Sequence, residues 1–172
     1  MLQTIRLFLA VAFLFTVVSA QAQTPIKCGH MNLGNLLEGL PETTQANKDL
    51  EAFAATYAAK GDSLGKIFEA AATTFQKEYQ EGKLIPVVAQ QQYAALEKQQ
   101  KELENYQKTS EQAVSIKRDE LLNPILTKIY DSIKAVATEN GYLMIFDTST
   151  GAALYALESE DITPLVKKKM GL

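Results

Sequence analysis

The chain has 172 residues, the length of one domain, and carries 17 Lys and Arg against 20 Asp and Glu, a net charge of −3. An acidic balance disfavours non-specific nucleic-acid binding, which depends on clustered basic residues that neutralise phosphates, and general attraction to anionic membranes. With one cysteine, Cys28, and one histidine, His30, the sequence has no internal disulfide and no pattern of the usual zinc sites.

The first 22 residues are typical of a secretory signal peptide. Arg6 gives a positive start, residues 7–18 are almost wholly apolar, and Ala20-Gln21-Ala22 places small residues at a cleavage site. The alternative is an N-terminal membrane anchor, but the apolar run is short for a span, which needs ~20 residues. We therefore expect 1–22 to be removed and 23–172 to form a single domain.

Residues 26–33 predict a short strand, because the stretch is rich in apolar residues and is bounded by Pro25 and Gly34. Cys28 and His30 would lie on one face, and Gly29, Met31 and Leu33 on the other. Residues 34–39 then predict a helical turn, which Gly39 and the nearby Pro41 prevent from continuing.

The middle of the chain, residues 43–120, predicts two long helices that fold back on each other as an arm. Larger or apolar residues step by three, four or seven, as expected for one buried stripe per helix. They are Leu50, Phe53, Tyr57, Leu64, Phe68, Ala71 and Phe75 in the first helix, and Ala89, Tyr93, Leu96, Leu103, Tyr106, Ala113 and Leu121 in the second. Gly82 and Pro86 lie between them and favour a helix end and a helix start, so the pair is antiparallel.

Three positions in the arm are hinge candidates: Gly61, Gly65 and Pro124. Each glycine costs a helix ~1 kcal/mol relative to Ala, and either a flexible point or close approach of the two helices would explain the pair. Proline inside a helical pattern kinks the axis, so Pro124 should mark the place where the arm meets the body.

The C-terminal part predicts the rest of a small body, formed by residues 23–42 and 121–172. After an apolar core helix that ends near Gly141, residues 142–146 and 152–156 read as an antiparallel hairpin around a polar turn. Thr163-Pro164 starts a last helix.

A body with about three short strands predicts a homo-oligomer, because such a sheet is marginal and leaves open edges. Copies of the same chain would close it at a symmetry axis. The strand residues expected in that shared core are Met31, Leu33, Leu143, Ile145 and Leu154.

The residue types of the sequence favour a protein that is not an enzyme and needs no cofactor or metal. A lone histidine in a strand, such as His30, is a structural residue in most proteins. No set of nucleophile, base and orienting residue accompanies it. Cys28 reads as a small buried apolar residue, with an intermolecular disulfide or a reactive thiol as the alternative.

Several mobile amphipathic arms on one base would instead enclose a space. Spare apolar residues on the arms could touch a guest weakly at many points. The candidates for such contact are Tyr57, Phe68, Phe75, Leu84, Ile85 and Tyr93. For most of them the alternative is that they form the seam between the two helices.

The two ends of the chain resemble the Skp/OmpH family of periplasmic outer-membrane-protein chaperones. The resemblance rests on four stretches in order: 31–37 (MNLGNLL), 122–126 (LNPIL), 137–142 (ATENGY) and 161–163 (DIT). It implies an α+β fold in which a small β-body, the trimerisation core, carries a long antiparallel coiled-coil hairpin.

The same resemblance implies a periplasmic homotrimer that holds unfolded outer-membrane proteins between its arms without ATP. Family members are often basic whereas this chain is acidic, so the resemblance predicts no membrane-binding or lipopolysaccharide-binding site for this chain. We expect peripheral membrane association at most. The alternative function is a structural coiled-coil adaptor of the cell envelope.

Overall fold

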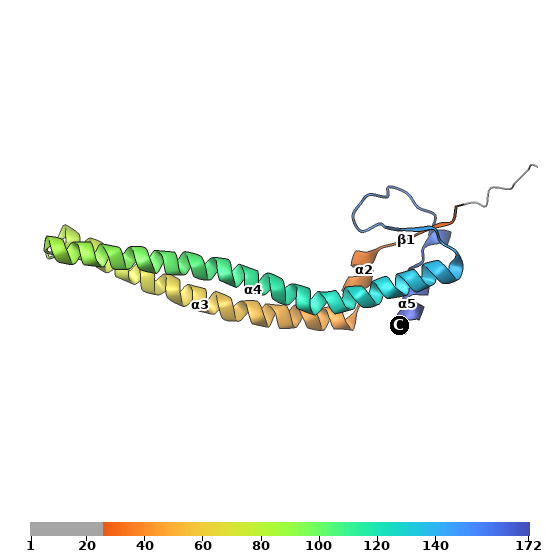
Figure 1. Cartoon of the computed structure of the whole chain (residues 1–172), viewed down its shortest axis with the longest axis horizontal. Helices are drawn as coiled ribbons and strands as arrows, with labels where there is room; N and C mark the ends of the chain where they lie inside the picture. Colours follow the sequence, from red (N-terminus) through yellow and green to blue (C-terminus); the bar gives the residue numbers. More distant parts are fainter. Residues whose placement is uncertain (1–25) are drawn as a thin grey trace, which may run out of the picture.

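The computed structural model describes residues 26–172, so the expected signal peptide lies outside the described residues. A long helical hairpin projects from a small body that holds both the start of the described chain and its C-terminus (Figure 1). The elements are β1 (Cys28–Met31), α2 (Leu33–Glu38), α3 (Pro41–Gln80), α4 (Pro86–Asn140), β2 (Met144–Asp147), the 3₁₀ turn η1 (Glu158–Glu160) and α5 (Thr163–Met170).

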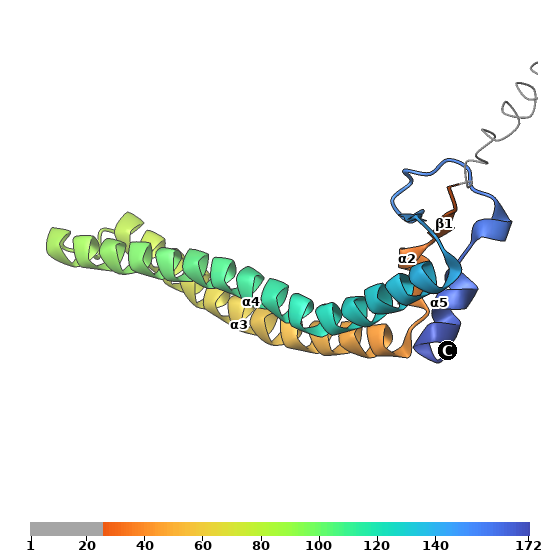
Figure 2. The ribbon, with the colours of Figure 1, turned by 45° about the vertical axis from the view of Figure 1, so that its right-hand side comes forward.

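The predicted hairpin is confirmed: α3 and α4 run side by side in opposite directions along the arm (Figures 1 and 2). The 40 residues of α3 reach about 60 Å at 1.5 Å per residue. The helices are joined by a tight turn in which Gly82 has φ +65°, and Pro86 opens α4. Gly82 is needed there because side chains with a Cβ rarely adopt positive φ.

The second helix is longer than its partner and continues past the arm into the body. α4 has 55 residues and passes through Pro124 without a break, so the proline does not divide the helix. Its axis changes direction as it leaves the arm for the body (Figure 2). The end of α4 is set by Gly141, where the sequence indicated it, and the φ of +71° at this residue gives a left-handed cap.

The predicted antiparallel hairpin of residues 142–146 and 152–156 is wrong. Within residues 26–172 the sheet has two strands, and β1 pairs with β2 in parallel, from Cys28 opposite Met144 to Met31 opposite Asp147. The other edge of β1 is occupied by residue 161, through one isolated bridge to His30 and the hydrogen bond from the Ile162 N–H to the His30 carbonyl (2.9 Å). Residues 152–156 therefore form no strand within the subunit.

The core lies in the body, where β1, α2 and α5 pack on the C-terminal part of α4. Its buried apolar residues are Met31, Leu36, Leu40, Ala46, Ile125, Ile129, Val136, Ile162 and Val166. The two predicted faces of the first strand are confirmed over residues 28–31, where Gly29 and Met31 are buried while Cys28 and His30 are partly exposed. Leu33, which was predicted on this strand, is instead the first residue of α2. Between residues 47 and 124 no side chain is fully buried, so the arm is a thin helix pair that its own seam stabilises weakly.

Two local arrangements fix the strands against the helices. A Cβ at Gly29 would lie 2.9 Å from Cγ2 of Ile162 and 3.1 Å from Cε1 of Tyr142, so only glycine fits at this crossing. At the end of β2, one carboxylate oxygen of Asp147 accepts the N–H groups of Leu33 (3.1 Å) and Ser149 (2.8 Å), and this ties β2 to the first turn of α2. The fold class expected from the sequence, a small β-containing body with a long helical hairpin, is thus confirmed.

Candidate functional site

The arm carries apolar side chains both in its seam and outside it. Tyr57, Phe68, Phe75 and Leu84 are partly buried along the helix pair, whereas Ile85 and Tyr93 are 65% and 56% exposed. Aromatic contacts join the two helices near the outer end of the arm, where the Phe75 and Tyr93 ring centroids lie 6.5 Å apart. Of the six residues proposed for guest contact, Ile85 and Tyr93 therefore offer the most free surface.

Sequence reasoning missed a second set of exposed apolar side chains on the arm. These are Ile67 (56% exposed), Tyr79 (63%), Val87 (62%) and Ile116 (59%). Ile67, Val87 and Ile116 fall outside the seam series, and an apolar residue off the buried stripe of a solvated helix is the sequence signal for exposed apolar surface. Tyr79 follows the seam residue Phe75 by four positions, and the centroids of the two rings lie 5.9 Å apart.

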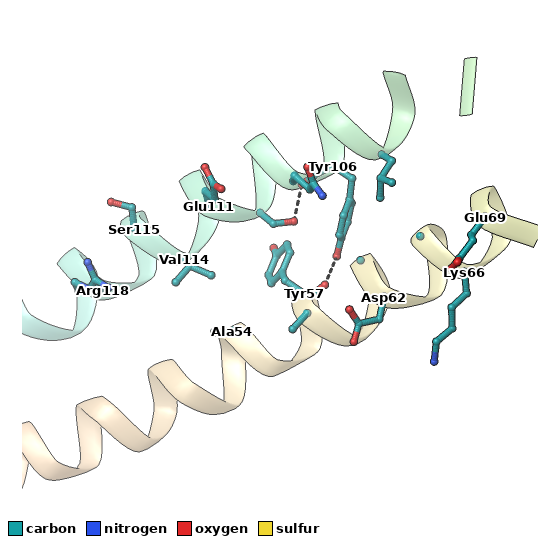
Figure 3. Close-up of a pocket in the computed structure, with 16 residues that line it drawn as sticks. Ala54, Tyr57, Asp62, Lys66, Glu69, Tyr106, Glu111, Val114, Ser115 and Arg118 are labelled. Atoms are coloured by element: carbon teal, nitrogen blue, oxygen red, sulfur yellow. Dashed lines mark hydrogen bonds between the residues drawn. The ribbon is translucent and has the colours of Figure 1, made fainter. Parts of the chain in front are cut away.

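Besides a groove of about 440 Å³ beside Ala71 and Phe75, two larger grooves run along the helix pair. The one near the outer end has a volume of about 580 Å³, and its apolar lining comes from Phe68, Phe75, Tyr79, Tyr93 and Leu96. The other, in the middle of the arm, has a volume of about 890 Å³ and mixes small, aromatic and charged residues (Figure 3). Both are open to solvent, so they form shallow surfaces rather than enclosed sites.

The glycines of the arm lie in this second groove without close packing. A Cβ at Gly65 would meet nothing within 4 Å, and one at Gly61 would make ordinary contact, 3.6 Å, with Tyr106. Close approach of the two helices therefore does not explain these glycines. Their role as hinges, like that of Pro124, stays a prediction.

The five residues predicted for the shared core divide into two groups. Met31 is 2% exposed inside the core of the single subunit, and Leu33 and Ile145 are partly buried against that core. Leu143 and Leu154 are 68% and 98% exposed.

Other large apolar side chains of the body are also exposed: Met144, Phe146, Tyr155 and Leu157. Within residues 26–172 β2 pairs only with β1, so its outer edge has no strand partner. An open strand edge beside exposed apolar side chains is typical of a surface that another chain covers.

The single histidine and the single cysteine lie in the body. The Nε2 atom of His30 is hydrogen-bonded to the carbonyl of Leu157 (2.9 Å), and Cys28 is a partly buried free thiol. Among residues 26–172, no three His, Cys, Asp or Glu side chains gather in a group that could hold a metal ion. In the same part of the chain, every helix is too short or too polar to cross a bilayer.

Two carboxylates have lowered pKa values with clear causes. Burial raises the pKa of Asp147, but hydrogen bonds from the N–H and hydroxyl of Ser149 and the N–H of Leu33 outweigh it and bring the pKa below its ordinary value. The hydrogen bond from Lys128 and the charge of that lysine lower the pKa of Glu42. The Glu42–Lys128 ion pair, 2.8 Å long, joins α3 to α4 at the base of the arm. Both carboxylates thus hold the architecture together.

Comparisons with known proteins agree with this architecture. The model of the OmpH-like outer membrane protein family matches residues 27–170. The chain is 26% identical over 167 residues to the chaperone protein Skp of Pectobacterium atrosepticum, covering 91% of this chain and 93% of that protein. An OmpH-like protein of known crystal structure, from Caulobacter crescentus, shares the fold with a TM-score of 0.64 at 12% identity, over 83% of this chain and 82% of that one. A match over nearly the whole described chain, on a hairpin-and-body fold, shows that the protein belongs to the OmpH-like family.

Proposed function

We propose that this protein is a periplasmic, ATP-independent holdase chaperone. In this proposal, three copies assemble through their bodies, and their arms enclose unfolded outer-membrane proteins and keep them from aggregating. The protein would act by binding alone, without catalysis or a cofactor. Family membership supports the class of function, and the Skp relative is itself named a chaperone.

The observation that carries the proposal is the distribution of apolar surface along the arm. Large side chains such as Ile67, Tyr79 and Ile85 are more than half exposed on a hairpin that has no fully buried residue between 47 and 124. Scattered apolar contacts on such a surface give a guest many weak attachments, and many weak attachments tolerate varied sequences. A protein that recognises one folded partner would instead concentrate its contacts in a packed central cluster.

The body supports the assembly part of the proposal. A two-stranded sheet is marginal by itself, and within residues 26–172 the outer edge of β2 has no strand partner, while Leu143, Phe146 and Leu154 are exposed on the body. A second copy placed on this surface would remove the open edge and the apolar side chains from water together. Closed rotational symmetry then points all arms in the same direction and creates the enclosure.

The test is the aggregation of a urea-unfolded outer-membrane β-barrel protein after dilution, followed by light scattering with and without this protein. We expect suppression at a few-fold excess of trimer, with no effect of added ATP. Undiminished aggregation at that excess would contradict the proposal. An equal concentration of a folded, acidic control protein excludes a general effect of added protein.

A variant series tests whether the exposed apolar residues carry the binding. Replacing Ile67, Ile85, Val87 and Ile116 together by Ser should weaken suppression, because these side chains are more than half exposed and should contribute little to the fold. The matched control replaces four exposed glutamines of the same arm by Ser: Gln76, Gln80, Gln90 and Gln91. Equal activity of the two variants would show that guests bind elsewhere.

A further inference from the structure

We infer that the arm contains a joint in its middle, where residues 57–65 of α3 face residues 106–110 of α4, and that Tyr106 is the clasp that holds this joint closed. The joint is a conformational device within each subunit. It stands on contacts of the single chain and does not depend on the proposed function.

The first helix is weakened at this level. Gly61 and Gly65 lie one turn apart inside α3, and each lowers local helix stability relative to Ala. Packing does not compensate, since nothing lies within 4 Å of a Cβ built at Gly65. The groove beside them, about 890 Å³, leaves room for the two helices to shift against each other.

The second helix is weakened at the same level. The hydroxyls of Thr109 and Ser110 both donate to the main-chain carbonyl of Tyr106, at 3.0 and 2.6 Å. Hydroxyl groups that bond back to the preceding turn compete with the helical ladder and often bend a helix. Single bonds of this kind occur elsewhere in the described helices, as at Thr74 and Thr127, but two hydroxyls converge on one carbonyl only here.

Tyr106 connects the two weak points. Its hydroxyl donates to the carbonyl of Tyr57 (3.2 Å), and in an α-helix that carbonyl also accepts the N–H of Gly61. The two tyrosine rings stack with centroids 6.2 Å apart, and the ammonium of Lys60 lies 5.1 Å from the Tyr106 ring. Figure 3 shows Tyr106 reaching across the gap to α3.

This hydrogen bond has no equivalent farther out along the arm. Among the described residues, the only other hydrogen bond between α3 and α4 is the Lys128–Glu42 pair at the base. The outer half of the hairpin is held by apolar and aromatic contacts such as Phe75 with Tyr93. Releasing the clasp therefore frees the outer half of the arm to swing about the glycines while the base stays fixed.

The test is hydrogen–deuterium exchange of the purified protein with no guest present, so that its outcome does not depend on chaperone activity. Tyr106→Phe keeps the ring and removes only the clasp hydrogen bond. We expect exchange across residues 57–68 to accelerate about fivefold, the factor for a hydrogen bond of typical net strength, while residues 43–54 stay unchanged. Tyr79→Phe is the matched control, because Tyr79 is exposed on the same arm and its hydroxyl has no partner within residues 26–172.

A second variant tests the joint itself. Gly61→Ala combined with Gly65→Ala should slow exchange over residues 57–68, since alanine strengthens the helix and the groove accommodates both methyl groups. Exchange over 57–68 that equals exchange over 43–54 in the wild type would overturn the joint. Equal exchange of Tyr106→Phe and Tyr79→Phe would overturn the clasp.

Discussion

The substitution Leu154→Asp tests the assembly surface of the body most sharply. Leu154 is 98% exposed in the subunit, so the change should leave the fold of one chain intact. If the trimer covers this residue, each copy loses the burial of a leucine side chain, roughly 1.5–3 kcal/mol. Three copies lose roughly 5–9 kcal/mol, which lowers the association constant between about a thousandfold and a millionfold.

The assay is light scattering coupled to size separation, at protein concentrations from about micromolar upward, where a stable trimer of the wild type stays assembled. We expect the variant to elute as a monomer with unchanged helical content by circular dichroism. Ile67→Asp, at an exposed apolar position on the arm, is the matched control and should remain a trimer. A Leu154→Asp protein that stays trimeric throughout the concentration range would refute the placement of this surface at the symmetry axis.

Three further predictions concern the body and the tip of the arm. Gly29→Ala should destabilise the protein by about 1–3 kcal/mol, measured as a lower melting temperature, because its methyl group overlaps buried Ile162; Gly65→Ala, with nothing within 4 Å, should not lower it. Replacing Asp147 by Asn should lower the melting temperature at pH 7, and the difference should begin to shrink below pH about 4 and vanish only once the pH is below the lowered pKa of the folded state. The sign follows from the lowered pKa of this carboxyl, whose stabilising charge is present above its unfolded pKa and lost as pH falls through the folded one. The double replacement of Ile85 and Tyr93 by Ser should raise the Kd for an unfolded β-barrel protein about tenfold, measured by fluorescence anisotropy, and an unchanged Kd would place guest binding away from the tip.

The helical hairpin could be predicted from sequence because its signals are local. Spacing of apolar residues by three and four, with Gly82 and Pro86 at the turn, determines two helices and their antiparallel arrangement. The helix end at Gly141 is equally local, since a left-handed cap depends on a single residue.

The sheet was mispredicted because its pairing is not local. Residues 142–146 and 152–156 looked like a hairpin joined by a polar turn, yet β2 pairs with β1, more than a hundred residues away. The crossover between these parallel strands is the whole helical arm. Residues 161–162 pair with the edge of β1 opposite β2. The loop before them leaves Tyr155 82% exposed.

The candidate surfaces were only partly predictable for a related reason. The stepping of apolar residues identified the seam, but whether a seam residue also faces solvent depends on the angle and spacing of the two helices. Phe68 and Phe75 are partly buried for that reason, while Tyr93, in the same kind of series, is 56% exposed. The Tyr106–Tyr57 hydrogen bond joins positions 49 residues apart and has no sequence signature.

The measurement that tests the central claim most directly is one titration: aggregation of an unfolded outer-membrane β-barrel protein against increasing amounts of the wild type and of Leu154→Asp. If arms on a shared base enclose the guest, the wild type should suppress aggregation with a sharp end point near one trimer per guest, and the monomeric variant should fail at equal subunit concentration. Equal suppression by the monomer would contradict the enclosure, because single arms would then suffice.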